Sequence, residues 1–165
     1  MAKHNFYNAI WHVKCIRDGK EVWNFSKRNG LADEGEESML EIVFRKTAAY
    51  TPNQFYIRLC NDNLIETDTL SMIQNEMSGN GYAAQIVETS SVGFPTKDTY
   101  QGDYRLTSKE VTFTASGGDI GPIITAYLAT TSDNTGKLFA YLELPLTRTI
   151  LNGDSMVVQM AIILQ

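Results

Sequence analysis

Short runs of alternating apolar and polar residues fill the second half of the chain, from Asn80 to Gln165. The last run is the clearest, because its apolar positions recur at every second residue: Met156, Val158, Met160, Ile162 and Leu164. The residues between them form a mixed set, namely Val157, Gln159, Ala161, Ile163 and Gln165. A repeat of two residues predicts a β-strand with one buried and one mixed face. We expect this strand to lie centrally in a sheet, with its all-apolar face against the core.

Further runs of this kind predict strands over residues 9–16, 21–25, 54–60, 82–88, 111–115, 123–130 and 138–144. Asp18-Gly19 is a strong signal for a hairpin turn, and residues 133–136 predict another. Strands spaced by about 10 residues and joined by Gly, Asn and Asp turns are typical of a mainly β fold. We expect one antiparallel, jelly-roll-like β-sandwich domain over residues 9–165, preceded by an N-terminal arm over residues 1–8.

Residues 33–46 are the best candidate for a helix. Asp33 can cap its start, and the acidic residues that follow suit the positive end of the helix dipole, as Arg45 and Lys46 suit the negative end. The segment carries an apolar stripe formed by Met39, Leu40, Val43 and Phe44. We expect this helix to pack against one end or edge of the sandwich, and we expect a second short helix over residues 67–74.

Residues 90–103 form the longest stretch without periodicity, and Phe94 and Tyr100 lie within it. Loops of this length inside a compact domain are often functional. Two interpretations stand at this point. The loop either reaches a partner with its aromatic side chains, or it is a surface loop whose aromatic side chains fold back onto the body.

Composition narrows the classes of partner. The chain has 165 residues, a formal net charge of -5 and no dense basic block, so we expect no direct contact with nucleic acid. No apolar run reaches the ~18 residues of a membrane span, and residues 1–7 lack the apolar core of a signal peptide. We therefore expect the chain to reside in the cytoplasm, with Cys15 and Cys60 as buried free thiols.

Groups that could perform catalysis are sparse. His4 and His12 are the only histidines, and their spacing does not indicate a metal site. The sequence lacks the common nucleophile, zinc-protease, phosphate-loop and dinucleotide motifs. The acidic clusters are explained by a helix start and by turns. Arg105 and Arg148 could bind carboxylates of a partner, or could be solvated strand residues. We expect no catalytic residue, no metal, no cofactor and no enzymatic activity.

Several fragments resemble small structural proteins of tailed bacteriophages. The matching fragments are residues 55–59, 67–70, 111–115, 128–130 with 135–138, and 148–150 with 152–154, together with Glu76 and residues 79–82. The resemblance covers roughly Gly19 to Gln165 and implies a β-rich virion protein without catalytic residues. Some proteins of this group resemble capsid decoration proteins, which sit as trimers over junctions between capsid subunits, whereas others belong to tails or fibres.

The leading hypothesis is therefore a homotrimeric capsid decoration protein of a virion, assembled in the host cytoplasm, that binds the major capsid protein lattice or other virion proteins. Phe6, Tyr7, Phe94 and Tyr100, which lie in the two candidate arms, are the expected partner-binding residues, since aromatic residues dominate interface energetics.

Two alternatives remain at this level. The first is a tail, neck or fibre component of the virion. The second is a carbohydrate-binding β-sandwich module, in which Trp11, Trp23 and Tyr100 would need to be exposed and coplanar to form a platform for a sugar.

Overall fold

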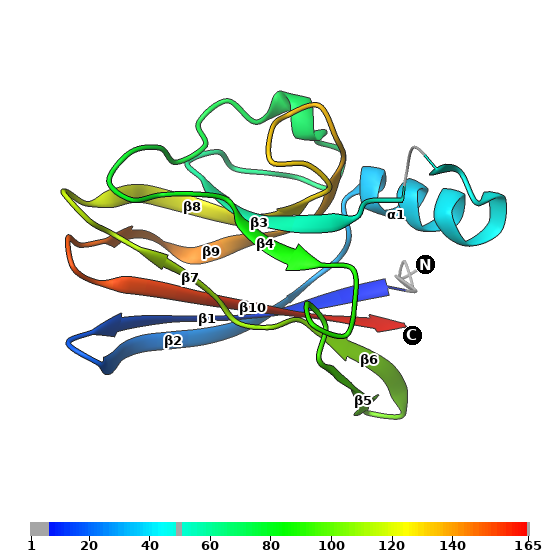
Figure 1. Cartoon of the computed structure of the whole chain (residues 1–165), viewed down its shortest axis with the longest axis horizontal. Coiled ribbons are helices and arrows are strands. Elements are labelled where there is room, and N and C mark those ends of the chain that lie inside the picture. The colour runs from blue at the N-terminus through cyan, green and yellow to red at the C-terminus, as the bar shows by residue number, and fades with distance from the viewer. Residues whose placement is uncertain (1–6, 49–50, 165) are drawn as a thin grey trace.

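A computed structural model describes residues 7–48 and 51–164 of the chain. It consists of two antiparallel sheets packed face to face, as Figure 1 shows. The first sheet has the order β2 (Lys20–Asn29), β1 (Tyr7–Arg17), β10 (Ser155–Leu164), β6 (Asp103–Thr107) and β5 (Thr96–Tyr100), with β7 (Val111–Thr114) also paired to β10. The second has the order β4 (Gln85–Glu88), β3 (Gln54–Cys60), β8 (Ile120–Ala129) and β9 (Leu138–Ile150). The predicted β-sandwich is confirmed, while the more specific jelly-roll topology stays a prediction.

Strand β10 is central in the first sheet, as predicted. It pairs with β1 along its whole length, with β7 near its start and with β6 near its end. Met156, Val158 and Met160 are fully buried between the sheets, which confirms the assignment of the apolar face. The end of the strand differs from the prediction, because Ile162 is only half-buried and Leu164 is 48% exposed. The cause is that the sandwich is open at this end, so the second sheet does not cover the last residues of β10.

Strand β3 is buried on both faces, because the second sheet is covered on both sides. Phe55, Ile57 and Leu59 face the main core between the sheets. On the other face, Cys60 joins a smaller cluster formed with residues of the 64–73 segment and of strands β8 and β9. This outer cluster is why β3 carries buried residues at consecutive positions rather than at every second one.

Arg58 is a charged residue in this outer layer, and its side chain is only 1% exposed. Its guanidinium group forms an ion pair with Glu76, in which Nε donates to Oε1 at 2.8 Å. It also donates to the carbonyl of Asp133 at 2.9 Å and to Oδ1 of Asn134 at 3.0 Å, and it lies 5.2 Å from the ring centroid of Tyr127. A buried charge of this kind is tolerated only when its donors are satisfied, so these contacts join β3 to the 70–82 segment and the β8–β9 hairpin.

The predicted helix is present and begins at Asp33. Helix α1 (Asp33–Leu40) continues into the π-helical turn η1 (Glu41–Arg45). Ala32, not Asp33, occupies the N-cap position, and its side chain makes no capping bond. Glu34 holds the helix to the sandwich instead, because its carboxylate accepts backbone N–H bonds from Leu70 at 2.9 Å and Leu138 at 2.8 Å.

The prediction that the apolar stripe of this helix packs against the sandwich is wrong. Leu40, Val43 and Phe44 are 53%, 55% and 76% exposed, and of the four predicted residues only Met39 packs against the core. The inner face is formed by Gly35, Ser38, Met39 and Ile42, which recur at helical spacing. Gly35 lies so close to β9 that a Cβ atom there would be 2.0 Å from the carbonyl oxygen of Phe139. The small residues of the inner face allow this close approach, and the helix therefore turns its larger apolar residues outward.

Two further predictions differ from the structure. The second helix is only a 3-10 turn, η3 (Leu70–Met72), although Leu70 and Ile73 are buried. The expected loop over residues 90–103 contains strand β5, which forms a hairpin with β6. Strand β5 lies at an edge of the sheet and its side chains are largely exposed, so it lacks the apolar alternation by which strands are recognised in a sequence.

The burial difference along β10 predicts different costs for two truncations. Met160→Ala should reduce the free energy of unfolding by about 2–5 kcal/mol, because it leaves a cavity in a closed part of the core. Ile162→Ala should cost less than about 2 kcal/mol, because its side chain borders solvent. Urea melts followed by circular dichroism measure both values. Equal costs would mean that the end of β10 is closed in solution.

The buried ion pair predicts a large effect at Arg58. Arg58→Ala should reduce the free energy of unfolding by about 3–5 kcal/mol, because Glu76 is left without its counter-charge. Arg105→Ala is the matched control, since Arg105 pairs with Asp98 at the surface and its loss should change the urea midpoint little. A similar midpoint shift for the two arginine variants would contradict a structural role for the Arg58 network.

Candidate interaction site at the open end of the sandwich

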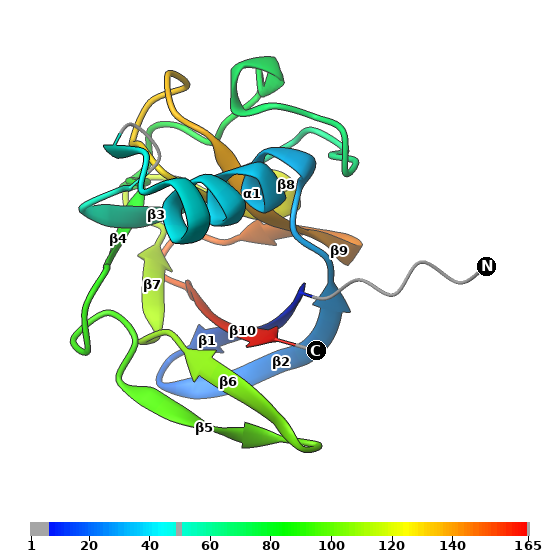
Figure 2. The ribbon, with the colours of Figure 1, turned by 90° about the vertical axis from the view of Figure 1, so that its right-hand side faces the viewer.

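A large hollow lies at the end of the sandwich where β1 begins and β10 ends. It is a groove of about 850 Å³ between the helix, the β5–β6 hairpin and the end of β10. Figure 2 looks onto this end, with α1 lying across the second sheet and the β5–β6 hairpin on the far side of β10. The volume falls in the range of sites that enclose a sizeable ligand or several side chains of a partner.

Three phenylalanine residues form the floor of the groove. The rings of Phe55 and Phe139 meet edge to face with centroids 5.0 Å apart, and those of Phe55 and Phe94 do so at 6.5 Å. All three side chains belong to the buried core or border it. Because these rings are packed by the sandwich itself, the floor is preformed rather than assembled by a partner.

The walls are also apolar. One wall carries Met39 and Ile42 from the inner face of the helix, and the other carries Leu106 with Ile162 and Leu164 of β10. Tyr104, at the rim on strand β6, is 69% exposed. Together with the outer face of the helix, defined as Leu40, Val43 and Phe44, these residues concentrate much of the exposed large apolar surface of the described chain at one end. A gathering of this kind marks an interaction site more often than a solvated surface.

Charged groups near the groove are few and largely neutralised. Arg105 donates to both carboxylate oxygens of Asp98, at 2.8 and 2.6 Å, and lies 5.2 Å from the ring centroid of Tyr100. The hydrogen bond from Arg105 lowers the pKa of Asp98, so this carboxylate stays ionised at neutral pH. Lys97 is exposed at the rim of the groove. The site can therefore bind an apolar surface with a limited electrostatic contribution.

The residues predicted to bind partners are placed differently from one another. Phe94 is 9% exposed and forms part of the groove floor, so it folds back onto the body rather than reaching outward. Tyr100 is half-buried at the end of β5, where its ring contacts Arg105. Both side chains lie on the face of the hairpin opposite to that of Lys97. Tyr7 begins β1 and is paired with Leu164 of β10 in the strand register, and Phe6 lies outside the described residues.

Sequence reasoning missed the groove itself. Its floor and walls come from segments that are distant in the chain, and no local pattern indicates that they meet. One signal was present in the sequence: Leu40, Val43 and Phe44 stand out as apolar residues on a helix that is otherwise rich in acidic residues. The prediction is that these three residues are buried, whereas the structure shows that they are exposed.

The other arginine and aromatic candidates have internal contacts. The guanidinium of Arg148 lies 4.4 Å from the ring centroid of Trp23, and Trp23 in turn stacks with Phe25 at 6.0 Å. Trp11 is fully buried in the core. The sugar platform of Trp11, Trp23 and Tyr100 is therefore wrong, because an indole within the core cannot stack on a sugar ring.

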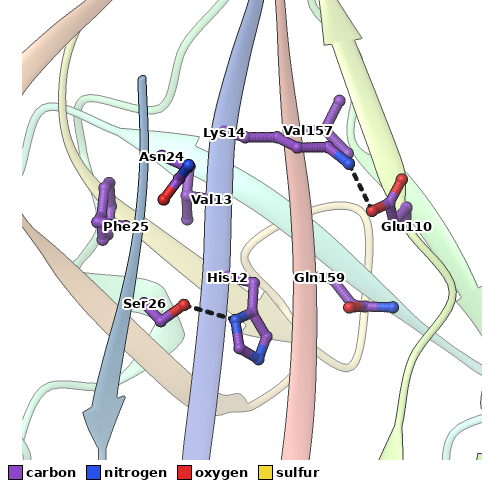
Figure 3. A pocket seen from close by; sticks show the side chains of 9 residues that line it. All are labelled: His12, Val13, Lys14, Asn24, Phe25, Ser26, Glu110, Val157 and Gln159. Atoms are coloured by element: carbon purple, nitrogen blue, oxygen red, sulfur yellow. Dashed lines mark hydrogen bonds and ion pairs between the residues drawn. The ribbon is translucent and has the colours of Figure 1, made fainter. Parts of the chain in front are cut away.

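A second, smaller hollow of about 220 Å³ lies on the outer face of the first sheet, and Figure 3 shows its lining. Nδ1 of His12 is 2.6 Å from Oγ of Ser26, and Lys14 donates to Glu110 at 2.7 Å. Partial desolvation, followed by the nearby charge of Arg105, lowers the pKa of His12, so its imidazole is neutral at pH 7. These polar side chains satisfy one another across neighbouring strands, which is typical of a solvated sheet face.

The described residues hold no group of three or more His, Cys, Asp or Glu side chains placed to bind a metal ion. Cys15 and Cys60 are both buried and free, and burial raises the pKa of Cys60 to about 12, so this thiol is unreactive at neutral pH. Within the described ranges, helices long and apolar enough to cross a membrane are absent.

Comparison with known proteins connects this architecture to a family. A family model described as podophage GP4 fiber I protein gp80 matches residues 30–163. The match begins just after β2 and includes the helix, the Arg58 network and the walls of the groove apart from Leu164. Curated proteins provide no significant match to the chain.

Proposed function

We propose a fibre role for this chain, because it belongs to the family of the podophage GP4 fiber I protein gp80 and is a bacteriophage virion structural protein. The observation that carries the proposal is the extent of the match, which runs over residues 30–163 and includes the second sheet, the helix and every strand of the first sheet except β1 and β2. The description of this family supports the fibre alternative better than the capsid decoration role that the sequence suggested.

In this role the domain acts as a rigid module that binds neighbouring virion proteins. A β-sandwich with a preformed core loses little conformational entropy when it associates with a partner. The apolar groove supplies the contact area, since burying apolar surface is the main favourable contribution to protein association. We propose a binding role rather than an enzymatic one, assembly in the host cytoplasm, and self-association into a trimer.

Labelled virions test the fibre role directly. A short epitope inserted at the exposed Asp18-Gly19 turn should leave the groove accessible, because this turn lies at the opposite end of the sandwich, as Figure 1 shows. Antibody-gold labelling in the electron microscope should then decorate the fibres. Label spread evenly over the head would overturn the fibre role and support capsid decoration, whereas label absent from virions would overturn both.

The N-terminal segment provides a separate prediction. Deleting residues 1–6, which lie before β1, should leave the melting temperature unchanged and reduce incorporation into virions, as expected of an arm that contacts a neighbour. Quantitative immunoblots of purified virions measure incorporation. Incorporation equal to that of the full chain would show that Phe6 makes no contribution to binding.

A further inference from the structure

The outer face of the helix and the apolar groove are two unpartnered apolar surfaces on the same chain. Leu40, Val43 and Phe44 of the outer face follow the i, i+3, i+4 spacing by which an amphipathic helix inserts into a groove. They are more than half exposed, and Phe44 at 76% is the most exposed large apolar side chain of the described residues. A side chain of this size held in water on an ordered element indicates a surface that is covered in the assembled state.

The helix cannot fill the groove of its own chain. Met39 and Ile42, on the inner face, already form one wall of that groove. The inner face is held against β9 by the close approach of Gly35 to Phe139 and by the bonds that Glu34 accepts. The outer face therefore points away from the groove and is available only to another molecule.

We infer that the outer face of the helix of one copy occupies the groove of a second copy, an inference that rests on the proposed function and names the partner as this chain itself. The groove holds about 850 Å³ and is apolar on its floor and both walls, so it can take several apolar side chains at once. Every copy carries one helix and one groove, and such a contact between unlike surfaces forms a ring or a reciprocal pair where its rotation closes, and an open filament where it does not.

Charge supports the same docking direction. Glu37 precedes Leu40 by one helical turn, has 54% of its side chain exposed, and forms a 3.7 Å ion pair with Lys137 of its own chain. Lys97 is exposed at the groove rim, directly opposite Leu106 in the β5–β6 pairing. In the proposed contact, the acidic N-terminal half of the helix, which includes Asp33, Glu36 and Glu37, can lie towards Lys97 of the other copy. The opposite signs favour this orientation of the helix over its reverse.

Two charge-introducing variants test the contact, one on each surface. Phe44→Glu disables the helix and leaves the groove intact, whereas Leu106→Glu disables the groove and leaves the helix intact. Sedimentation velocity should show association of the unmodified chain, and each variant alone should associate at least about 30-fold more weakly, as expected for loss of a central apolar contact. Mixing the two variants should restore a 1:1 pair, because one intact helix and one intact groove are then present.

Leu146→Glu is the matched control, since Leu146 is 64% exposed on β9 and does not line the groove, and it should associate like the unmodified chain. If Leu106→Glu fails to fold, Tyr104→Glu at the exposed rim replaces it. An unmodified chain that stays monomeric at tens of micromolar, or a mixture that forms no pair, would overturn the inference.

The remaining outcome identifies a different occupant. If deletion of residues 1–6 abolishes association while Phe44→Glu does not, the groove binds the N-terminal segment, and the helix contact is wrong. Gold labelling of virions is independent of these measurements. A chain that labels fibres but does not self-associate would overturn this inference and leave the fibre role standing.

Discussion

The buried ion pair between Arg58 and Glu76 is the interaction on which the outer half of the molecule depends. Arg58 lies on β3, in the second sheet, and its guanidinium reaches the 70–82 segment and the β8–β9 hairpin at once. Burial raises the pKa of Tyr82, so its phenol stays protonated, donates to Glu76 at 2.9 Å and accepts from the N–H of Leu59 at 3.0 Å. The ring of Tyr82 then stacks on Phe113 of the first sheet at 5.7 Å. The polar network thus connects the outer segment with the second sheet, and the stacked ring of Tyr82 extends this connection to the first sheet.

This network also determines where the helix lies. The 3-10 turn at Leu70 and the start of β9 at Leu138 are held by the same layer, and both donate backbone N–H bonds to Glu34 of the helix. These bonds hold the first turn of α1 against the body, and the close contact of Gly35 with Phe139 lies in the same turn. In the second half of the helix, Met39 packs against the core, whereas Leu40, Val43 and Phe44 are exposed. This half therefore projects at the end of the sandwich with its outer face uncovered, and it forms one wall of the groove.

The same arrangement explains why a virion protein would keep an open end. Closing the sandwich over Leu106, Ile162 and Leu164, which are half-buried or exposed, would stabilise the isolated chain, since fully burying a large apolar side chain contributes about 1.5–3 kcal/mol. When the end stays open, this apolar surface is buried only when the chain assembles with a partner. The corresponding free energy then favours assembly instead of folding. The sandwich tolerates the opening because the central part of its core is closed by fully buried residues such as Trp11 and Met160.

The sequence by itself determined the elements whose pattern is local. Alternation over residues 156–164 and the Asp18-Gly19 turn were sufficient for the central strand and the first hairpin, because a strand with one buried face imposes a repeat of two. The fragments that indicated a phage structural protein include Arg58, Glu76 and Tyr82, although their spacing alone did not indicate that they touch.

Tertiary structure decided what depends on contacts between distant segments. The helix turned Leu40, Val43 and Phe44 outward because Gly35 and Ser38 allow the closer approach to β9, a choice between two faces that helical periodicity cannot make. Phe94 forms part of a floor rather than an arm because its ring packs edge to face on Phe55, which in turn packs on Phe139. The groove exists only where the helix, β3, β9, the β5–β6 hairpin and the end of β10 meet, and no local pattern carries that information.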